Sequence, residues 1–288
     1  MTTIAVAGTH GFLFKPMVAA FTSELFSGKY ALPVIALTRD VATEEPIDGV
    51  KFVQVDYADP ATVVAALKGV DALVNLIGFA PDIWTVLVDA AVTAGVGKYF
   101  PSEFGCDYRK LESTGVKTFL SLKADHATYA RKAGIPKVVS VVTGLFSKLF
   151  VFGFMGHDFK NGTAQFYGDG TQKVTTTDLA DIGLSVASLA YRPASELPDY
   201  VAVQGNAVTL NETVDIYEAA TGKKLTVTYT PAPDFSVATD AESTDIGAKL
   251  KTMSAHPECE AFSFSGNDNE FVNPGLWKWV TIADFFKA

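Results

Sequence analysis

Two glycines near the start of the chain have a spacing that suits nucleotide binding. Gly8 and Gly11 follow the apolar run 3–8 and precede a segment with helical spacing of apolar residues. In a dinucleotide-binding turn, the first glycine permits a tight bend and the second lets the backbone approach a pyrophosphate. A third glycine would let the helix pack closely on the strand, but Phe14 stands there. The turn therefore predicts a dinucleotide site, unless the side chain of Phe14 fills the groove.

Two adjacent charges end the second predicted strand, 32–40. Arg39 could pair with the 2′-phosphate of NADP through its guanidinium fork, whereas an acidic residue such as Asp40 would favour the ribose hydroxyls of NAD. The alternative is a surface arginine at the end of a strand. The two charges together leave the choice of dinucleotide open.

The elements that would position these residues alternate along the first half of the chain. Apolar strands are predicted at 3–8, 32–40, 50–56, 70–78, the first half of 98–105 and 136–144, and helices at 12–26, 59–69, 82–94 and 116–133. This alternation indicates an α/β fold in which helices cover both faces of a parallel sheet.

The alternation is lost after about residue 145. Residues 165–177 predict a hairpin that turns at Gly-Asp-Gly, 178–190 a helix, 199–205 a strand, and 211–231 a helix followed by a strand. We therefore divide the chain into an NAD(P)-binding domain, 1–144, and a smaller C-terminal α+β substrate lobe, 145–288, which is partly interleaved with the sheet.

Composition excludes several classes of protein. The 288 residues are 48% hydrophobic and 19% charged, as in globular proteins, and 21 Phe and 10 Tyr could form apolar pockets. A net charge of −9 without any Lys/Arg-rich run argues against nucleic acid binding. The two cysteines, Cys106 and Cys259, and the four histidines lack metal-ligand spacing, so no metal is predicted.

The sequence predicts a cytoplasmic protein without a membrane partner. The N-terminus lacks a basic segment followed by a long apolar one, which argues against a secretory signal. The longest apolar stretch, 138–156, is interrupted by Lys148 and three glycines, so a transmembrane span is the weaker interpretation.

Several motifs, in order along the chain, are similar to those of one family. They are AGTHGFL, LTRD, VQVDYADPATVVAALKGVDALVNLIG, VGKYFPSEFG, FLSLKADHATYARKAGIP, AQFYGDGTQKVTTTDLADIG and NPGLWKW. Over essentially the whole chain, this order resembles the NmrA-like, isoflavone-reductase-like branch of the atypical short-chain dehydrogenases, of the fungal type. The resemblance implies a Rossmann-like doubly wound parallel sheet, an NADPH site and a substrate cleft roofed by the C-terminal half.

The resemblance also implies which residues bind the cofactor. They are Gly8, Thr9, His10, Gly11, Phe12 and Leu13 in the turn, Arg39 at the 2′-phosphate, Ile77, Gly78 and Phe79 beside the ribose and nicotinamide, and Lys123. Phe14 departs from the pattern of the family.

Lys123 matches the active-site lysine of the family. Ordinary short-chain dehydrogenases carry a Tyr four residues before this Lys, but Phe119 stands there, so the phenol is missing. The resemblance implies that Lys123 orients the ribose or acts as an acid or base near the substrate. His126 and Glu103 are further catalytic candidates, each with a structural alternative.

Apolar residues near these groups could line the substrate pocket, although core packing is the alternative for most of them. The predicted pocket residues are Ser102, Phe104, Phe146, Phe150 and Phe154.

Three functions follow as hypotheses. The first is an NADPH-dependent reductase of an apolar, aromatic or phenolic small molecule, with Lys123 supplying or relaying the proton. The second is a cofactor-independent cyclase, isomerase or hydroalkoxylation-type enzyme whose dinucleotide site is impaired by Phe14. The third is a dinucleotide-sensing regulator without catalysis. A homodimer stays an open alternative.

Overall fold

The computed structural model describes residues 1–113, 120–240, 245–256 and 260–287, with only the backbone described at 111–113, 153–154 and 260. Its central sheet has six parallel strands in the order β3-β2-β1-β4-β5-β6. These strands are β1 Thr2–Ala7, β2 Tyr30–Thr38, β3 Val50–Gln54, β4 Ala72–Asn75, β5 Lys98–Phe100 and β6 Lys137–Val138. The order reverses between β1 and β4, so the predicted doubly wound sheet is confirmed.

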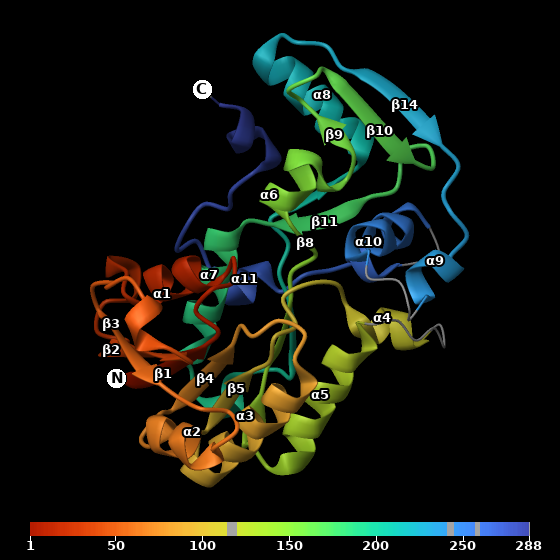
Figure 1. Ribbon diagram of the computed structural model, residues 1–288. Helices are drawn as coiled ribbons and strands as arrows, with labels where there is room; N and C mark the ends of the chain where they lie inside the picture. Colours follow the sequence, from red (N-terminus) through yellow and green to blue (C-terminus); the bar gives the residue numbers. More distant parts are fainter. Residues whose placement is uncertain (114–119, 241–244, 257–259, 288) are drawn as a thin grey trace.

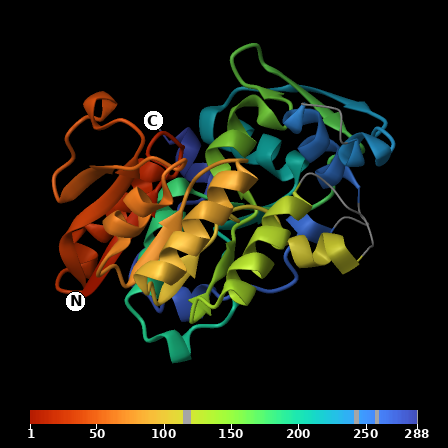
Figure 2. The ribbon, with the colours of Figure 1, turned by 60° about the horizontal axis from the view of Figure 1, so that its bottom comes forward.

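Helices cover both faces of this sheet, as Figures 1 and 2 show. One face carries α1 (Phe14–Phe21) and α7 (Leu179–Ala190), and the other carries α2 (Pro60–Leu67), α3 (Pro81–Ala94) and α5 (Ser121–Ala133). The alternation of side chains along β1 fits this arrangement, because Ile4 and Val6 face the first layer while Ala5 and Ala7 face the second.

A strand from the second half of the chain extends the sheet. After Val139, β7 (Ser140–Val142) continues the path of β6 and pairs in parallel with β12 (Tyr200–Ala202). Helix α7 also comes from the second half and packs against α1. The sheet and its helices are therefore built from both halves of the sequence.

The C-terminal lobe, at the top of Figure 1, consists of two small sheets and short helices around a core of its own. Its strands are β8 Leu145–Phe146, β9 His157–Asp158, β10 Thr163–Tyr167, β11 Val174–Thr177, β13 Asn206–Val208 and β14 Thr226–Thr230. The remaining helices of the described residues are η1 Glu24–Phe26, η2 Val41–Thr43, α4 Tyr108–Ser113, α6 Ser147–Leu149, η3 Phe150–Phe154, η4 Ala194–Glu196, α8 Leu210–Thr221, α9 Ser236–Thr239, α10 Ile246–Ala255, η5 Glu260–Phe262, α11 Asn269–Val272 and η6 Ile282–Phe286.

The predicted hairpin at 165–177 is wrong. Strand β10 pairs with β9 and β14, whereas β11 pairs with β8 and β13 in another sheet. The Gly-Asp-Gly turn is held by Asn211 at the start of α8, whose side chain donates to the carbonyl of Asp169 at 3.0 Å and whose backbone N–H donates to that of Gly170 at 3.2 Å. Packing against α8 therefore directs the chain out of the first sheet.

The first helix is shorter than the predicted 12–26. It ends at Phe21 because the hydroxyl groups of Thr22 and Ser23 donate to the carbonyls of Val18 and Ala20, at 3.0 and 2.8 Å, and compete with further helical bonds. Helix α5 begins at Ser121, and the predicted start at 116 lies outside the described residues. Within the described ranges, no helix combines the length and hydropathy needed to cross a membrane.

Candidate functional site

The glycine turn lies between β1 and α1, at the carboxyl edge of the sheet. Gly8 has a φ of +98°, and a Cβ there would lie 2.8 Å from both the backbone N of Ile77 and the backbone C of Leu76. A side chain at Gly8 would therefore collide with the backbone that follows β4. Gly11 is less constrained, because its Cβ would lie 3.8 Å from the nearest carbonyl oxygen.

Phe14 does not fill the groove. Its side chain is only 2% exposed and packs between α1 and the sheet, with its ring centroid 6.0 Å from that of Phe52. On its other side, α1 is approached closely by α7 at Gly183, where a Cβ would lie 2.6 Å from the carbonyl oxygen of Pro16. Of the two positions that the sequence left open for Phe14, the ring takes the one between helix and sheet, outside the groove.

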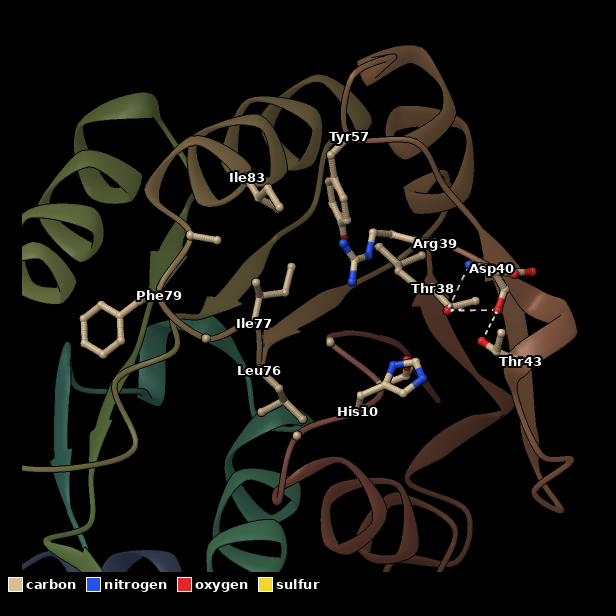
Figure 3. A pocket seen from close by; sticks show the side chains of 16 residues that line it. His10, Thr38, Arg39, Asp40, Thr43, Tyr57, Leu76, Ile77, Phe79 and Ile83 are labelled. Atoms are coloured by element: carbon tan, nitrogen blue, oxygen red, sulfur yellow. Dashed lines mark hydrogen bonds between the residues drawn. The ribbon is translucent and has the colours of Figure 1, made fainter. Parts of the chain in front are cut away.

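A cavity of about 780 Å³ opens above the turn (Figure 3). It is lined by Gly8, Thr9, His10, Gly11, Leu37, Thr38, Arg39, Asp40, Thr43, Tyr57, Leu76, Ile77, Gly78, Phe79, Ala80 and Ile83. This cavity, which we call the turn cavity, contains most of the predicted cofactor residues. Three do not line it: Phe12 is 68% exposed at the surface, Leu13 is buried in the core, and Lys123 lines a second cavity instead.

Arg39 supplies a positive charge to the turn cavity. Its guanidinium lies beside the ring of Tyr57 in Figure 3, and burial raises the pKa of that phenol to about 12 even though Arg39 lowers it. The neighbouring carboxylate of Asp40 caps a short helix, η2 (Val41–Thr43), by accepting from the N–H of Ala42 at 2.9 Å. Arg39 therefore faces Tyr57 in the turn cavity, whereas Asp40 is hydrogen-bonded to the backbone of its own loop.

A second cavity of about 200 Å³ shares Phe79 with the turn cavity. It is lined by Phe79, Phe104, Gly105, Cys106, Tyr108, Leu120, Lys123, Gly144, Leu145, Phe146, Leu149, Ile246, Leu250 and Phe262. We call it the apolar cavity, since most of these side chains are hydrocarbon. Of the predicted pocket residues, it includes Phe104 and Phe146.

The other predicted pocket residues lie elsewhere. Ser102 is buried without lining either cavity, and Phe150 is fully buried in the core of the lobe. The sequence could not separate them from true pocket residues, because the same residue types are found in the core and in pocket walls. The side chain of Phe154 lies outside the described residues.

Lys123 brings an amine to the apolar cavity. Its Nζ lies 5.2 Å from the ring centroid of Phe79, a cation–π distance. Burial lowers the pKa of Lys123, while nearby Cys106 and Glu103 act in the opposite direction. The amine can thus give up its proton more easily than an exposed lysine. Phe119, the residue in place of the usual Tyr, lies outside the described residues.

Glu103 directly precedes Phe104, Gly105 and Cys106 in the sequence, which line the apolar cavity, but does not line it itself. It is 2% exposed, and among the described residues its Oε2 has no hydrogen-bond partner. Burial raises the pKa of this carboxyl to about 7, against the opposing effects of a hydrogen bond from Ser140 and the charges of Arg131 and Lys123. A carboxyl with such a pKa exchanges protons near neutral pH.

His126, predicted as a catalytic candidate, belongs to a buried network and lines neither of the two cavities. Its Nε2 lies 2.8 Å from the hydroxyl of Tyr99, which also accepts from Asn75 at 2.8 Å. Burial lowers the pKa of His126 to about 4, so its ring stays neutral. The network supports the turn cavity indirectly, because it holds the backbone of Ile77 in the cavity wall. The N–H of Ile77 donates to Asn75 at 2.9 Å, and the carbonyl of Ile77 accepts from the indole of Trp84 at 3.1 Å.

Sequence reasoning missed two polar residues of the apolar cavity, Cys106 and Tyr108. They directly follow the PSEFG motif, which was the available signal. The thiol of Cys106 and the hydroxyl of Tyr108 are hydrogen-bonded, and burial holds the pKa of Tyr108 well above its usual value. The phenol therefore stays protonated and can donate a hydrogen bond.

Comparison with known proteins agrees with this architecture. The model of the NmrA-like family matches residues 1–268. Isoflavone reductase homolog IRL of Zea mays is 30% identical over 249 residues, which cover 79% of this chain and 77% of that protein. Phenylcoumaran benzylic ether reductase Betv6 of Betula pendula is 25% identical over 249 residues, with coverage of 79% and 77%.

A solved structure extends the similarity to the whole fold. AtPrR2 with NADP+ and (+)pinoresinol has a TM-score of 0.79 at 23% sequence identity, covering 99% of this chain and 98% of that one. The turn, the doubly wound sheet and the family match across most of the sequence lead to one conclusion: the chain belongs to the NmrA-like family, alongside isoflavone reductase homologues.

Proposed function

We propose that this protein is an NADPH-dependent reductase of a small apolar, aromatic molecule. The observation that carries the proposal is the pair of cavities that share Phe79, one built on a glycine turn with Arg39 and the other apolar with Lys123. Its relatives are named reductases, which supports the same class of reaction here.

The turn cavity fits a dinucleotide. The absence of a side chain at Gly8, the open space above the turn and the guanidinium of Arg39 suit a pyrophosphate and a 2′-phosphate. Ile77, Gly78 and Phe79 would lie beside the ribose and nicotinamide, as the family resemblance implies. The chemistry expected from a bound nicotinamide dinucleotide is hydride transfer.

Lys123 is the group that we propose for proton supply. Reduction of a carbonyl, an alkene or a benzylic ether needs a proton in addition to a hydride, and the amine of Lys123 lines the cavity that would hold the substrate. Its lowered pKa favours release of the proton. Glu103, whose pKa is about 7, interacts electrostatically with Lys123 and could return the proton from its buried position.

The apolar cavity defines the substrate class. Aromatic and aliphatic side chains form most of its wall, so burial of a hydrophobic ring would drive binding. Cys106 and Tyr108, whose thiol and hydroxyl are hydrogen-bonded to each other, give this wall a polar point that could instead bond an oxygen at one edge of that ring. A phenolic or other oxygen-bearing aromatic compound meets both requirements.

The non-redox hypothesis loses its main support. It rested on Phe14 as a residue that narrows the dinucleotide groove and on the missing phenol at Phe119. The ring of Phe14 is buried in the core instead, while the missing phenol still stands. A non-catalytic regulator would need no amine at the apolar cavity, so Lys123 favours an enzyme over a sensor.

The test is NADPH binding by isothermal titration calorimetry. We expect Arg39→Ala to weaken binding by about tenfold or more, because it removes a charge-assisted hydrogen bond to phosphate. Lys68→Ala is the matched control, since Lys68 is exposed at the end of α2 and does not line the turn cavity. No heat of binding for the wild-type protein at millimolar NADPH would refute the proposal.

A further inference from the structure

Residues 40–45, which follow β2, include three acidic residues in three environments. Asp40 caps η2, and the side chain of Glu45 is 87% exposed opposite Lys15. The side chain of Glu44, by contrast, is only 8% exposed. A carboxylate removed from water at this position needs a specific explanation.

Glu44 joins the glycine turn to the end of β2. Its Oε1 accepts hydrogen bonds from the hydroxyl groups of Thr9, at 2.6 Å, and Thr38, at 2.5 Å. It also lies 3.9 Å from Nε2 of His10. Since Thr9, His10 and Thr38 all line the turn cavity, the carboxylate lies directly behind its wall, bonded to the residue that precedes Arg39.

The negative charge of Glu44 is not cancelled by these contacts. Both hydroxyl donors are neutral, and His10, which is 69% exposed, carries a charge only when it is protonated. A charge shielded from water acts over a longer distance than an exposed one. Glu44 therefore contributes negative potential to the same end of the cavity at which Arg39 contributes positive potential.

We propose that Glu44 sets the balance between the two nicotinamide dinucleotides. It opposes the additional charge of a 2′-phosphate and so offsets part of the selectivity that Arg39 provides, which lets the site accept NADH as well as NADPH. This inference rests on the proposed function and concerns the specificity of the same cavity.

The test compares Kd values for NADPH and NADH by calorimetry in the wild-type protein and two variants. Glu44→Gln keeps an acceptor for Thr9 and Thr38 but removes the charge. We expect it to raise the ratio of NADPH to NADH affinity by about fivefold, mainly by tightening NADPH binding. Glu45→Gln removes a neighbouring exposed charge and should change the ratio by less than twofold.

A second variant tests the same balance without altering Glu44. Arg39→Ala leaves the carboxylate behind the wall of the cavity, and the protein should then bind NADH more tightly than NADPH. An unchanged ratio in Glu44→Gln, or a continued preference for NADPH in Arg39→Ala, would overturn the role of Glu44 while leaving the reductase proposal intact. Failure of the wild-type protein to bind either dinucleotide at millimolar concentration would instead refute the proposed function and this inference together.

Discussion

Substitution of Gly183 by Ala tests how α1 is held in place. In an ordinary helix interior, replacing Gly by Ala stabilises the folded state by about 0.5–1 kcal/mol. At Gly183, however, the new Cβ would lie 2.6 Å from the carbonyl oxygen of Pro16 and 3.3 Å from the Cα of Met17. These atoms belong to the backbone of α1, so they cannot move aside as a flexible side chain would.

The steric effect should outweigh the gain in helix propensity. An ordinary contact would require α1 and α7 to separate by roughly 0.8 Å in a closely packed core. Overpacking of this kind costs about 1–3 kcal/mol, so we expect a net loss of about 1–2 kcal/mol in the free energy of unfolding. Because α1 follows the glycine turn, we also expect weaker NADPH binding.

The assay is urea unfolding followed by circular dichroism, combined with calorimetric NADPH titration. Gly97→Ala is the matched control, because its Cβ would meet Asp71 at an ordinary 3.5 Å and its φ lies outside the left-handed region. It should be neutral or slightly stabilising. If Gly183→Ala is as stable as the wild-type protein, the argument that α1 and α7 depend on this contact is refuted.

Two further variants test the buried polar groups. Burial raises the pKa of Glu103 to about 7, so between about pH 4.5 and pH 7 the carboxyl is protonated in the folded state and ionised in the unfolded state. This group therefore makes the free energy of unfolding fall as the pH rises through that range. Glu103→Gln should remove up to about 3 kcal/mol of that decline in urea titrations across this range, and an identical pH dependence in both proteins would contradict the assignment. Tyr99→Phe should cost about 1–2 kcal/mol by leaving Asn75 and His126 without their partner. Tyr129→Phe, on the same helix as His126 but with its hydroxyl exposed, should change stability by less than about 0.5 kcal/mol, and equal losses in both variants would refute the role of the network.

The first half of the fold could be predicted from the sequence because its signals are local. Apolar strands, amphipathic helices and the Gly8–Gly11 spacing depend on neighbouring residues, and they identified the parallel sheet and the position of the turn. The direction of a side chain is a different problem. Phe14 is buried by Phe52 and the α1–α7 contact, and neither can be inferred from the spacing of the glycines.

The same limit applies to the candidate site. His126 has the residue type and helical position of a catalytic group, but the hydroxyl of Tyr99 on β5 holds it in the interior. The apolar cavity is completed by Ile246, Leu250 and Phe262, which come from the short helices α10 and η5 far along the chain. The position of His126 and the wall of the apolar cavity both depend on tertiary contacts between distant segments, which cannot be predicted from local sequence patterns.

The contribution of β12 and α7 to the sheet has a consequence for protein engineering. A cut at residue 144 would remove a strand of the parallel sheet and the helix that covers α1, exposing apolar residues such as Ile4 and Val6 to water. A chimera that exchanges substrate lobes between relatives should therefore take residues 179–202 from the parent that supplies the nucleotide turn. The segment 179–202 and the first 144 residues have to be inherited as one unit, even where the rest of the lobe is replaced.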